Sequence, residues 1–241
     1  MIRTAIVVGP RTRAGQAVVE RSIARGDDIF VAARHDADAA ALAGGETTVL
    51  RVDQGVDLLA QDAGPVRILV CALGPVHPEE ARAAEDTAAF LRDLGFIERL
   101  LVAISGRPAS VVLISTVIAL APGDDRRYYG GWKCLVEQQL AESIDRLAPR
   151  ASFSVVYPGR LVDGPARFVP GLHASYRRLA ATVDGLADGC CRSRVVGLDA
   201  RLWMAARGLK LLISSLLPQW TSPAGRSIEL PVVPHERSLR P

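Results

Sequence analysis

A tyrosine and a lysine four residues apart are the first side chains in this sequence that could do chemistry together. The chain carries 27 arginines and only two lysines, and one of these lysines, Lys133, follows Tyr129 by four positions. Residues i and i+4 share one face of a helix, so the ammonium group and the phenol can lie side by side. A neighbouring positive charge favours the phenolate and is expected to lower the pKa of Tyr129. The pair therefore predicts a proton donor and acceptor.

Two adjacent hydroxyl side chains precede this pair, at the end of the apolar run 111–115. They belong to Ser115 and Thr116. Consecutive side chains of a strand point to opposite faces, so only one of the two can face Tyr129. Either hydroxyl could donate a hydrogen bond to a substrate oxygen whose proton Tyr129 exchanges.

Short apolar runs rich in Val and Ile alternate with segments of helical apolar spacing. The expected strands are 5–8, 29–32, 48–52, 68–72, 111–115 and 152–156, and the expected helices are 16–25, 36–42, 87–104 and 132–147. This alternation predicts an α/β fold, a Rossmann-like doubly wound parallel sheet in a three-layer α/β/α arrangement. We expect a single domain over residues 1–241, with an irregular lid or substrate insertion at about residues 159–192 before a final helix and strand.

A glycine-containing turn follows the first expected strand and opens the first helix. Its glycines are Gly9 and Gly15, and the residues between them include Arg11 and Arg13. Ligands of open α/β sheets bind outside the carboxyl ends of the strands. Backbone N–H groups and a helix N-terminus at such a turn can face a pyrophosphate. We therefore expect a dinucleotide to bind here.

The end of the second expected strand indicates which dinucleotide. An acidic residue there would bind a ribose 2′-hydroxyl and repel a 2′-phosphate. Here the strand runs into Arg34, a guanidinium that can make charge-assisted hydrogen bonds to a phosphate. Arg11 and Arg13 add positive potential to the same edge, so the sequence favours NADP over NAD.

Taken together, these residues resemble the short-chain dehydrogenase/reductase family along nearly the whole chain. The matching positions are the turn Gly9 to Gly15, Asp53 at the adenine ring, Ala72 and Gly74 after the fourth strand, Ser115 and Thr116, the Tyr129/Lys133 pair, Pro158 and Gly159 beside the nicotinamide, and 222–230 as the last strand segment. The family's usual interval before the tyrosine favours Thr116 as the oxyanion donor, with Ser115 kept open. The resemblance implies reduction of a ketone, or oxidation of a secondary alcohol, of a small specialised metabolite. Tyr129 would be the general acid/base, and Lys133 would lower its pKa and bind the ribose.

The sequence also departs from the family pattern. Arg13 stands where the turn has its middle glycine, and the chain contains no asparagine, so the family's active-site Asn is absent. A non-redox enzyme on the same scaffold (a dehydratase, cyclase or isomerase) and a non-catalytic nucleotide-sensing protein therefore remain alternatives.

We expect the residues that contact the substrate to lie in the insertion. Phe168, Leu172 and Tyr176 could line an apolar pocket with His173 as a polar handle, although ordinary lid packing explains the same residues. His77, near the end of the fourth strand, is a further pocket residue or an exposed loop histidine.

The composition of the chain limits which metals, nucleic acids or membranes it is expected to bind. Four cysteines without a C-x-x-C pair predict free thiols in the cytoplasm and no metal site. With a net charge of +3 and 5% aromatic residues, no nucleic-acid interface is expected. No apolar run reaches the length of a membrane span. The basic, apolar segment 202–217 could lie on a membrane, but we expect it to pack on the core and at a subunit interface of a homodimer or homotetramer.

Overall fold

The structure is a computed structural model that describes residues 3–33, 46–51, 64–75, 77–120, 126–163, 172–189 and 193–216, with side chains described up to residue 213. Several expected features lie outside these residues: Arg34, Asp53, Phe168, the expected helix 36–42 and the expected last strand 222–230.

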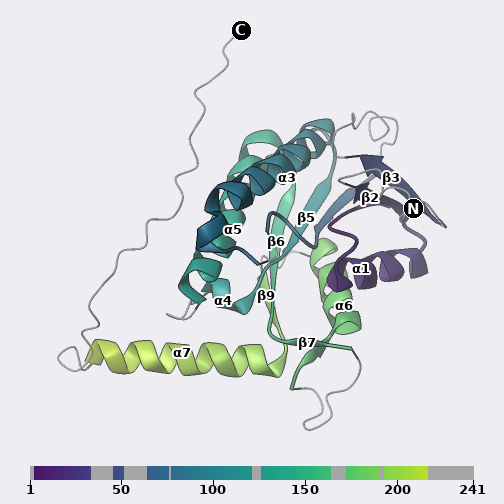
Figure 1. The fold of residues 1–241 in the computed structure, drawn as a ribbon. Coiled ribbons are helices and arrows are strands. Elements are labelled where there is room, and N and C mark those ends of the chain that lie inside the picture. Colours follow the sequence, from purple (N-terminus) through teal and green to yellow (C-terminus); the bar gives the residue numbers. More distant parts are fainter. Residues whose placement is uncertain are drawn as a thin grey trace.

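One parallel sheet of seven strands organises the described chain (Figure 1). Its order is β3-β2-β1-β4-β5-β6-β9, so the chain winds outward from β1 in one direction and then from β4 in the other. The strands are β1 (Thr4–Val8), β2 (Asp28–Ala33), β3 (Thr47–Arg51), β4 (Val66–Val70), β5 (Ala109–Ile114), β6 (Ser152–Pro158) and β9 (Ser193–Val196). The predicted doubly wound fold is confirmed.

Helices cover both faces of the sheet (Figure 1). On one face lie α3 (Ala83–Ala103) and α5 (Arg127–Leu147), with the short α4 (Val117–Leu120) beside α5 and the 3₁₀ turn η2 (Glu80–Arg82) before α3. On the other face α1 (Arg13–Ala24) packs against α6 (Tyr176–Ala187). Each face has its own buried cluster, with Phe90 and Trp132 in the first and Val18 and Leu179 in the second.

Helix α5 shows how the sequence divides one element between core and pocket. Its buried residues Trp132, Val136, Leu140 and Ile144 recur every four positions. That spacing keeps them on a single face of the helix, which packs on the sheet. Tyr129 and Lys133 are also four positions apart and lie on an adjoining stripe of the helix. They are near the start of α5, beside the residues that follow the carboxyl ends of the strands.

The expected irregular insertion contains regular structure. A two-stranded parallel sheet joins β7 (Leu161–Val162) to β8 (Ala174–Ser175), and α6 follows directly. Ser175 caps α6 by accepting a hydrogen bond from the Arg178 amide at 3.2 Å. Leu179, Val183 and Leu186 lie at helical spacing and are buried. The expectation of an irregular segment was therefore wrong over residues 174–187.

A buried guanidinium ties α6 to the middle of the sheet. Arg67 on β4 is 3% exposed and makes hydrogen-bonded ion pairs with Asp184 (3.3 Å) and Asp188. Arg25, at the end of α1, also reaches Asp184, at 2.7 Å. A buried charge is tolerated only where it is paired in this way, so the network fixes α1 and α6 against β4.

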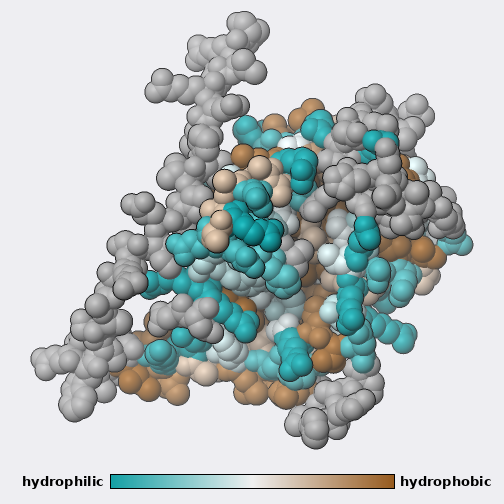
Figure 2. Space-filling model, in the orientation of Figure 1, coloured by the Kyte–Doolittle hydropathy of each residue, from teal (hydrophilic) through white to brown (hydrophobic). Residues whose placement is uncertain are grey.

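The last described helix, α7 (Leu198–Leu216), departs from expectation. Its first turn is anchored, because Ala200 is 1% exposed, but further along the helix large apolar side chains face solvent. Leu209, Leu211 and Leu212 are each more than half exposed. Figure 2 shows this as a brown strip along the bottom of the molecule. The prediction that this segment packs on the core was wrong for the described residues. No described helix is long and apolar enough to cross a membrane.

Candidate active site

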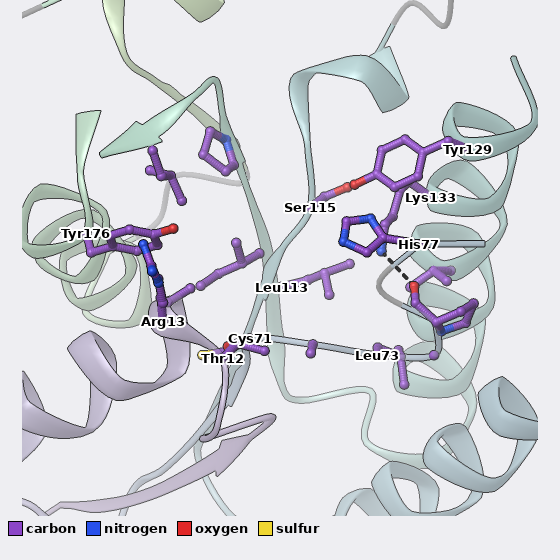
Figure 3. Close-up of a pocket in the computed structure, with 18 residues that line it drawn as sticks. Thr12, Arg13, Cys71, Leu73, His77, Leu113, Ser115, Tyr129, Lys133 and Tyr176 are labelled. Carbon is purple, nitrogen blue, oxygen red and sulfur yellow. Dashed lines mark hydrogen bonds between the residues drawn. The ribbon is translucent and has the colours of Figure 1, made fainter. Parts of the chain in front are cut away.

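A cavity of about 520 Å³ opens at the carboxyl ends of β1, β4, β5 and β6 (Figure 3). One wall comes from the β1–α1 turn with Thr12 and Arg13, and the floor comes from the segment after β4. The opposite wall carries Ser115, Tyr129 and Lys133. The cavity thus brings the predicted dinucleotide turn and the predicted acid/base pair together.

The β1–α1 turn is shaped by contacts that leave no room for side chains. Gly9 has φ +78°, and a Cβ built there would lie 2.7 Å from the Cβ of Ala72. A Cβ on Gly15 would overlap the Gly9 carbonyl oxygen and come within 2.8 Å of the Pro10 Cα. Thr12 caps α1 by accepting a hydrogen bond from the Gly15 amide at 3.0 Å. The two glycines therefore allow a tight turn that brings Thr12, Arg13 and Ala14, at the N-terminus of α1, to the wall of the pocket.

The floor of the pocket is also fixed by backbone hydrogen bonds. Gly74 has φ +68°, and its amide donates to the buried carboxylate of Asp93 on α3 at 3.1 Å. Cys71 lies beside it, and burial raises the pKa of its thiol to about 12. The Cys71 side chain is therefore a neutral thiol that fills space between the sheet and α1 rather than a nucleophile.

Tyr129 and Lys133 meet through the ring rather than through the phenol oxygen. The Lys133 Nζ lies 5.5 Å from the centre of the Tyr129 ring and donates a 3.4 Å hydrogen bond to the Pro75 carbonyl (Figure 3). Burial raises the pKa of Tyr129, and the charge that opposes this rise belongs to Arg126. Burial also lowers the pKa of Lys133, against the opposing charge of Glu137. The expectation that Lys133 lowers the pKa of Tyr129 was therefore wrong for this structure, because desolvation outweighs charge.

The structure separates the two candidate hydroxyls. Ser115 lines the pocket, and its side chain and the Tyr129 hydroxyl point toward one another in Figure 3. Thr116 turns away and accepts a 3.4 Å hydrogen bond from the Ile118 amide at the start of α4. The preference for Thr116, which came from spacing alone, is not supported by this placement.

Solved structures provide the external comparison. No family model matches the chain, and no curated protein matches it. A short-chain dehydrogenase from Burkholderia cenocepacia J2315, in complex with NADP, is similar over 91% of this chain and 98% of its own, with a TM-score of 0.65 and 18% identity. A short-chain dehydrogenase from Streptomyces avermitilis gives a TM-score of 0.64 at 20% identity, over 91% and 97% of the two chains. An oxidoreductase of the short-chain dehydrogenase/reductase family from Burkholderia thailandensis gives 0.61 at 19% identity, over 88% and 98%.

The chain has the fold of the short-chain dehydrogenase/reductases. The resemblance read from the motifs is thus confirmed in the architecture. Within this short-chain dehydrogenase/reductase fold, the pocket is lined by Ala72, Gly74 and Pro158, for which the resemblance predicts contacts with the cofactor. Gly159 does not, since it packs against the start of α7, where an added Cβ would lie 2.6 Å from the Asp199 carboxylate.

The two arginines of the turn have different surroundings. Arg11 is exposed and does not line the pocket. Arg13 lines it and crosses the mouth to form a 2.6 Å ion pair with Asp163, next to β7, although both side chains remain about two-thirds exposed. The guanidinium at the position of the missing glycine is thus directed toward the insertion.

The candidate substrate residues are divided as well. Tyr176 lines the pocket, and so does His77, the exposed loop histidine that follows β4. His173 instead lies 3.1 Å from Asp199 through its Nδ1, and the Leu172 carbonyl accepts from the Asp199 amide at 3.0 Å. Leu172 and His173 therefore anchor the insertion to α7 and do not line the pocket.

One residue in contact with the site, Glu137, was not predicted from the sequence. Glu137 lies on α5 four positions after Lys133, and its carboxylate accepts hydrogen bonds from Ser115 and from Tyr157 on β6. The same four-residue interval that pairs Tyr129 with Lys133 extends to Glu137, so the spacing contained the signal. Among the described residues, no cluster of His, Cys, Asp and Glu could hold a metal ion.

Proposed function

We propose that the protein is an NADP-dependent oxidoreductase that interconverts a ketone and a secondary alcohol of a small metabolite, with Tyr129 as general acid/base. The observation that supports this most is that the β1–α1 turn lines the same pocket as Ser115, Tyr129 and Lys133. The solved neighbour in complex with NADP shares the fold.

The residues present fit a dinucleotide. Glycines at positions 9 and 15 let the turn fold closely on itself and on Ala72, and the start of α1 (Thr12, Arg13 and Ala14) lines the pocket. The first-turn amides of α1 would hold the pyrophosphate, and Lys133 would bind the ribose. Arg34 follows β2 directly in the sequence, and we propose that it selects the 2′-phosphate of NADP. When bound, the nicotinamide supplies or accepts the hydride.

The residues of the chain handle the proton. Because burial raises the pKa of Tyr129, its phenol is protonated at neutral pH and can donate to a developing alkoxide. Arg126 supplies the charge that opposes this rise and favours the phenolate once the proton has left, while Lys133 lies over the ring of Tyr129. Burial by the pocket walls strengthens both interactions, since fewer water molecules screen them.

NADPH and NADH binding to the purified protein, followed by fluorescence, tests this proposal. We expect NADPH to bind more tightly than NADH, and Arg34→Ala to remove most of that difference. A ketone screen with NADPH then follows. If neither nucleotide binds, the redox proposal is wrong, and cofactor-free acid/base chemistry or a regulatory role takes its place.

Two departures from the family pattern favour the non-redox alternative. The chain has no asparagine to anchor the family's proton relay, and Arg13 replaces a glycine of the turn. A dehydratase, cyclase or isomerase would still need Tyr129 as an acid or base. Loss of such an activity in Tyr129→Phe, without consumption of NADPH, would identify this case, whereas a nucleotide sensor would be unaffected.

A further inference from the structure

Glu137 connects three elements behind the pocket. It stands on α5, and its Oε2 accepts a 2.8 Å hydrogen bond from the hydroxyl of Tyr157 on β6. Its Oε1 accepts a hydrogen bond from the Ser115 hydroxyl at the end of β5. Strands β5 and β6 are neighbours, and the Ser115 amide donates to the Val156 carbonyl at 2.9 Å. One carboxylate thus holds the side chains that leave two adjacent strands.

The hydrogens in this cluster can be assigned from chemistry alone. An ionised carboxylate only accepts, whereas a serine or tyrosine hydroxyl has one hydrogen to donate. Both hydroxyls must therefore give their hydrogens to Glu137. Ser115 then has only acceptor capacity left for the pocket, which it lines opposite the β1–α1 turn.

This assignment distinguishes the two forms of a carbonyl/alcohol couple. A ketone oxygen or an alkoxide needs a hydrogen-bond donor, and Ser115 in this state does not offer one. An alcohol carries its own hydrogen and can donate it to Ser115. A buried polar group without its complement costs binding energy, so the two forms are not equivalent at this wall.

The charged and titratable groups facing Glu137 are Tyr157 from β6 and Lys133 and Cys134 from α5. Burial lowers the pKa of Lys133, while the negative charge of Glu137 raises it. Burial and the hydrogen bond to Glu137 both raise the pKa of Tyr157. Burial and the same charge raise the pKa of Cys134. Tyr157 and Cys134 therefore stay neutral, and Lys133 is the cation beside this carboxylate.

We propose that Glu137 is a positioning residue that acts through Ser115, holding its hydroxyl as a hydrogen-bond acceptor, and that the pocket therefore recognises the alcohol form of its substrate. This rests on the oxidoreductase function proposed above. It assigns the hydroxyl-bearing partner as the form that binds more tightly in the resting complex. For oxidation the single alcohol hydrogen must turn from Ser115 to Tyr129, which exchanges the proton. Glu137 itself does not line the pocket.

The first experiment measures binding without turnover. Cyclohexanol is titrated into protein loaded with NADPH, and cyclohexanone into protein loaded with NADP⁺, because neither pair can react. We expect Glu137→Gln to weaken cyclohexanol binding about tenfold relative to cyclohexanone. The side-chain amide of the new glutamine can donate a hydrogen bond to Ser115. The Ser115 hydroxyl can then donate its own hydrogen to the ligand. Equal changes for both ligands would overturn the proposal.

The controls separate positioning from general structure. Glu142→Gln removes an exposed carboxylate from the same helix and should change the affinity for neither ligand. Tyr157→Phe removes one support of Glu137 but leaves the Ser115 hydrogen bond, so the alcohol preference should survive. In a Ser115→Ala background, Glu137→Gln should have no further effect on the preference. If Tyr157→Phe abolishes the preference as fully as Glu137→Gln does, Glu137 has a structural role only.

A second experiment needs neither cofactor nor substrate. The chain has only two lysines, so Lys210→Arg leaves Lys133 as the single lysine. Its ¹³Cε resonance in labelled protein then reports one titration. We expect Glu137→Gln to move that titration to lower pH, and Glu142→Gln to leave it in place. An unchanged titration would mean that position 137 carries no charge beside Lys133, and the assignment of the Ser115 hydrogen would be wrong even if NADPH binds.

Discussion

The two walls of the pocket are held by different kinds of interaction. The β1–α1 wall is a close fit of backbone against backbone, with Gly9 pressed on Ala72 and Gly15 pressed on the turn. The α5 wall is a set of polar side chains in which Glu137 holds Ser115 and Lys133 lies over Tyr129. The first wall has almost no room for side chains at its two glycines, whereas the second depends on which hydrogen-bonding groups its side chains carry.

The largest effect is expected on the α5 wall. Tyr129→Phe removes the proton that the reaction exchanges and should lower kcat about a thousandfold, within the range for a general acid. NADPH binding should stay within about twofold of the parent, since the ring and its contact with Lys133 remain. Steady-state kinetics on a ketone from the screen, with NADPH fluorescence alongside, measure both.

The adjacent tyrosine provides the matched control. Tyr128 packs edge-on against Trp132, and its buried hydroxyl has no hydrogen-bond partner among the described residues. Tyr128→Phe should therefore keep both activity and stability. Equal losses in the two variants would show that Tyr129 acts through packing, and the contrast between the walls would fail.

Added volume tests the other wall. Gly15→Ala places a methyl group against the Gly9 carbonyl and the Pro10 Cα, and should destabilise the protein by about 2 kcal/mol. Gly95→Ala, inside α3 with open space around its Cβ, should instead stabilise it by about 0.5–1 kcal/mol. Urea denaturation gives both values, and a neutral Gly15→Ala would contradict the close fit.

The two neighbouring hydroxyls give a smaller and sharper contrast. Ser115→Ala should lower kcat/KM for alcohol oxidation about tenfold, because it removes the acceptor for the hydrogen of the alcohol. Thr116→Ala should stay within about twofold, since its hydroxyl faces the start of α4. The reverse ranking in initial-rate measurements would return the catalytic role to Thr116.

The pH dependence follows from the burial of the α5 wall. Burial raises the pKa of Tyr129 from 10.0 and lowers that of Lys133 from 10.5. As the pH rises, Lys133 should lose its charge first, so ketone reduction should fall on the alkaline side with Lys133. Lys133→Arg keeps a permanent cation and should move that fall to higher pH. A pH–rate profile unchanged by this substitution would assign the alkaline loss to another group.

The smallest effect is expected from Arg13→Ala. The ion pair with Asp163 is exposed, and such pairs contribute about 0.2–1 kcal/mol. We expect NADPH to bind about threefold more weakly, with the difference disappearing in high salt. A loss of a hundredfold by titration would show that Arg13 binds a phosphate directly, so that the β1–α1 wall also depends on a side chain.

The same contrast explains what the sequence could reveal. The sheet, the glycine turn and the Tyr129/Lys133 face were predictable, because strand alternation, steric need and helical periodicity are local properties. The choice between Ser115 and Thr116 could not be predicted, because β5 ends at Ile114 and the alternation of side chains stops there. Spacing places Lys133 near Tyr129 but does not give the depth of burial, which sets the direction of the Tyr129 pKa. The position of α7 depends on long-range packing, which no local pattern contains.

Helix α7 has a consequence for the shape of the molecule. It leaves the edge of the sheet after β9 and extends sideways from the body (Figure 1). Nineteen residues make a rod about 28 Å long, comparable with the radius of gyration of about 18 Å for a compact chain of 241 residues. The described part of the molecule therefore has a long axis that the sheet alone does not have, and α7 should contribute to small-angle scattering as a projecting rod.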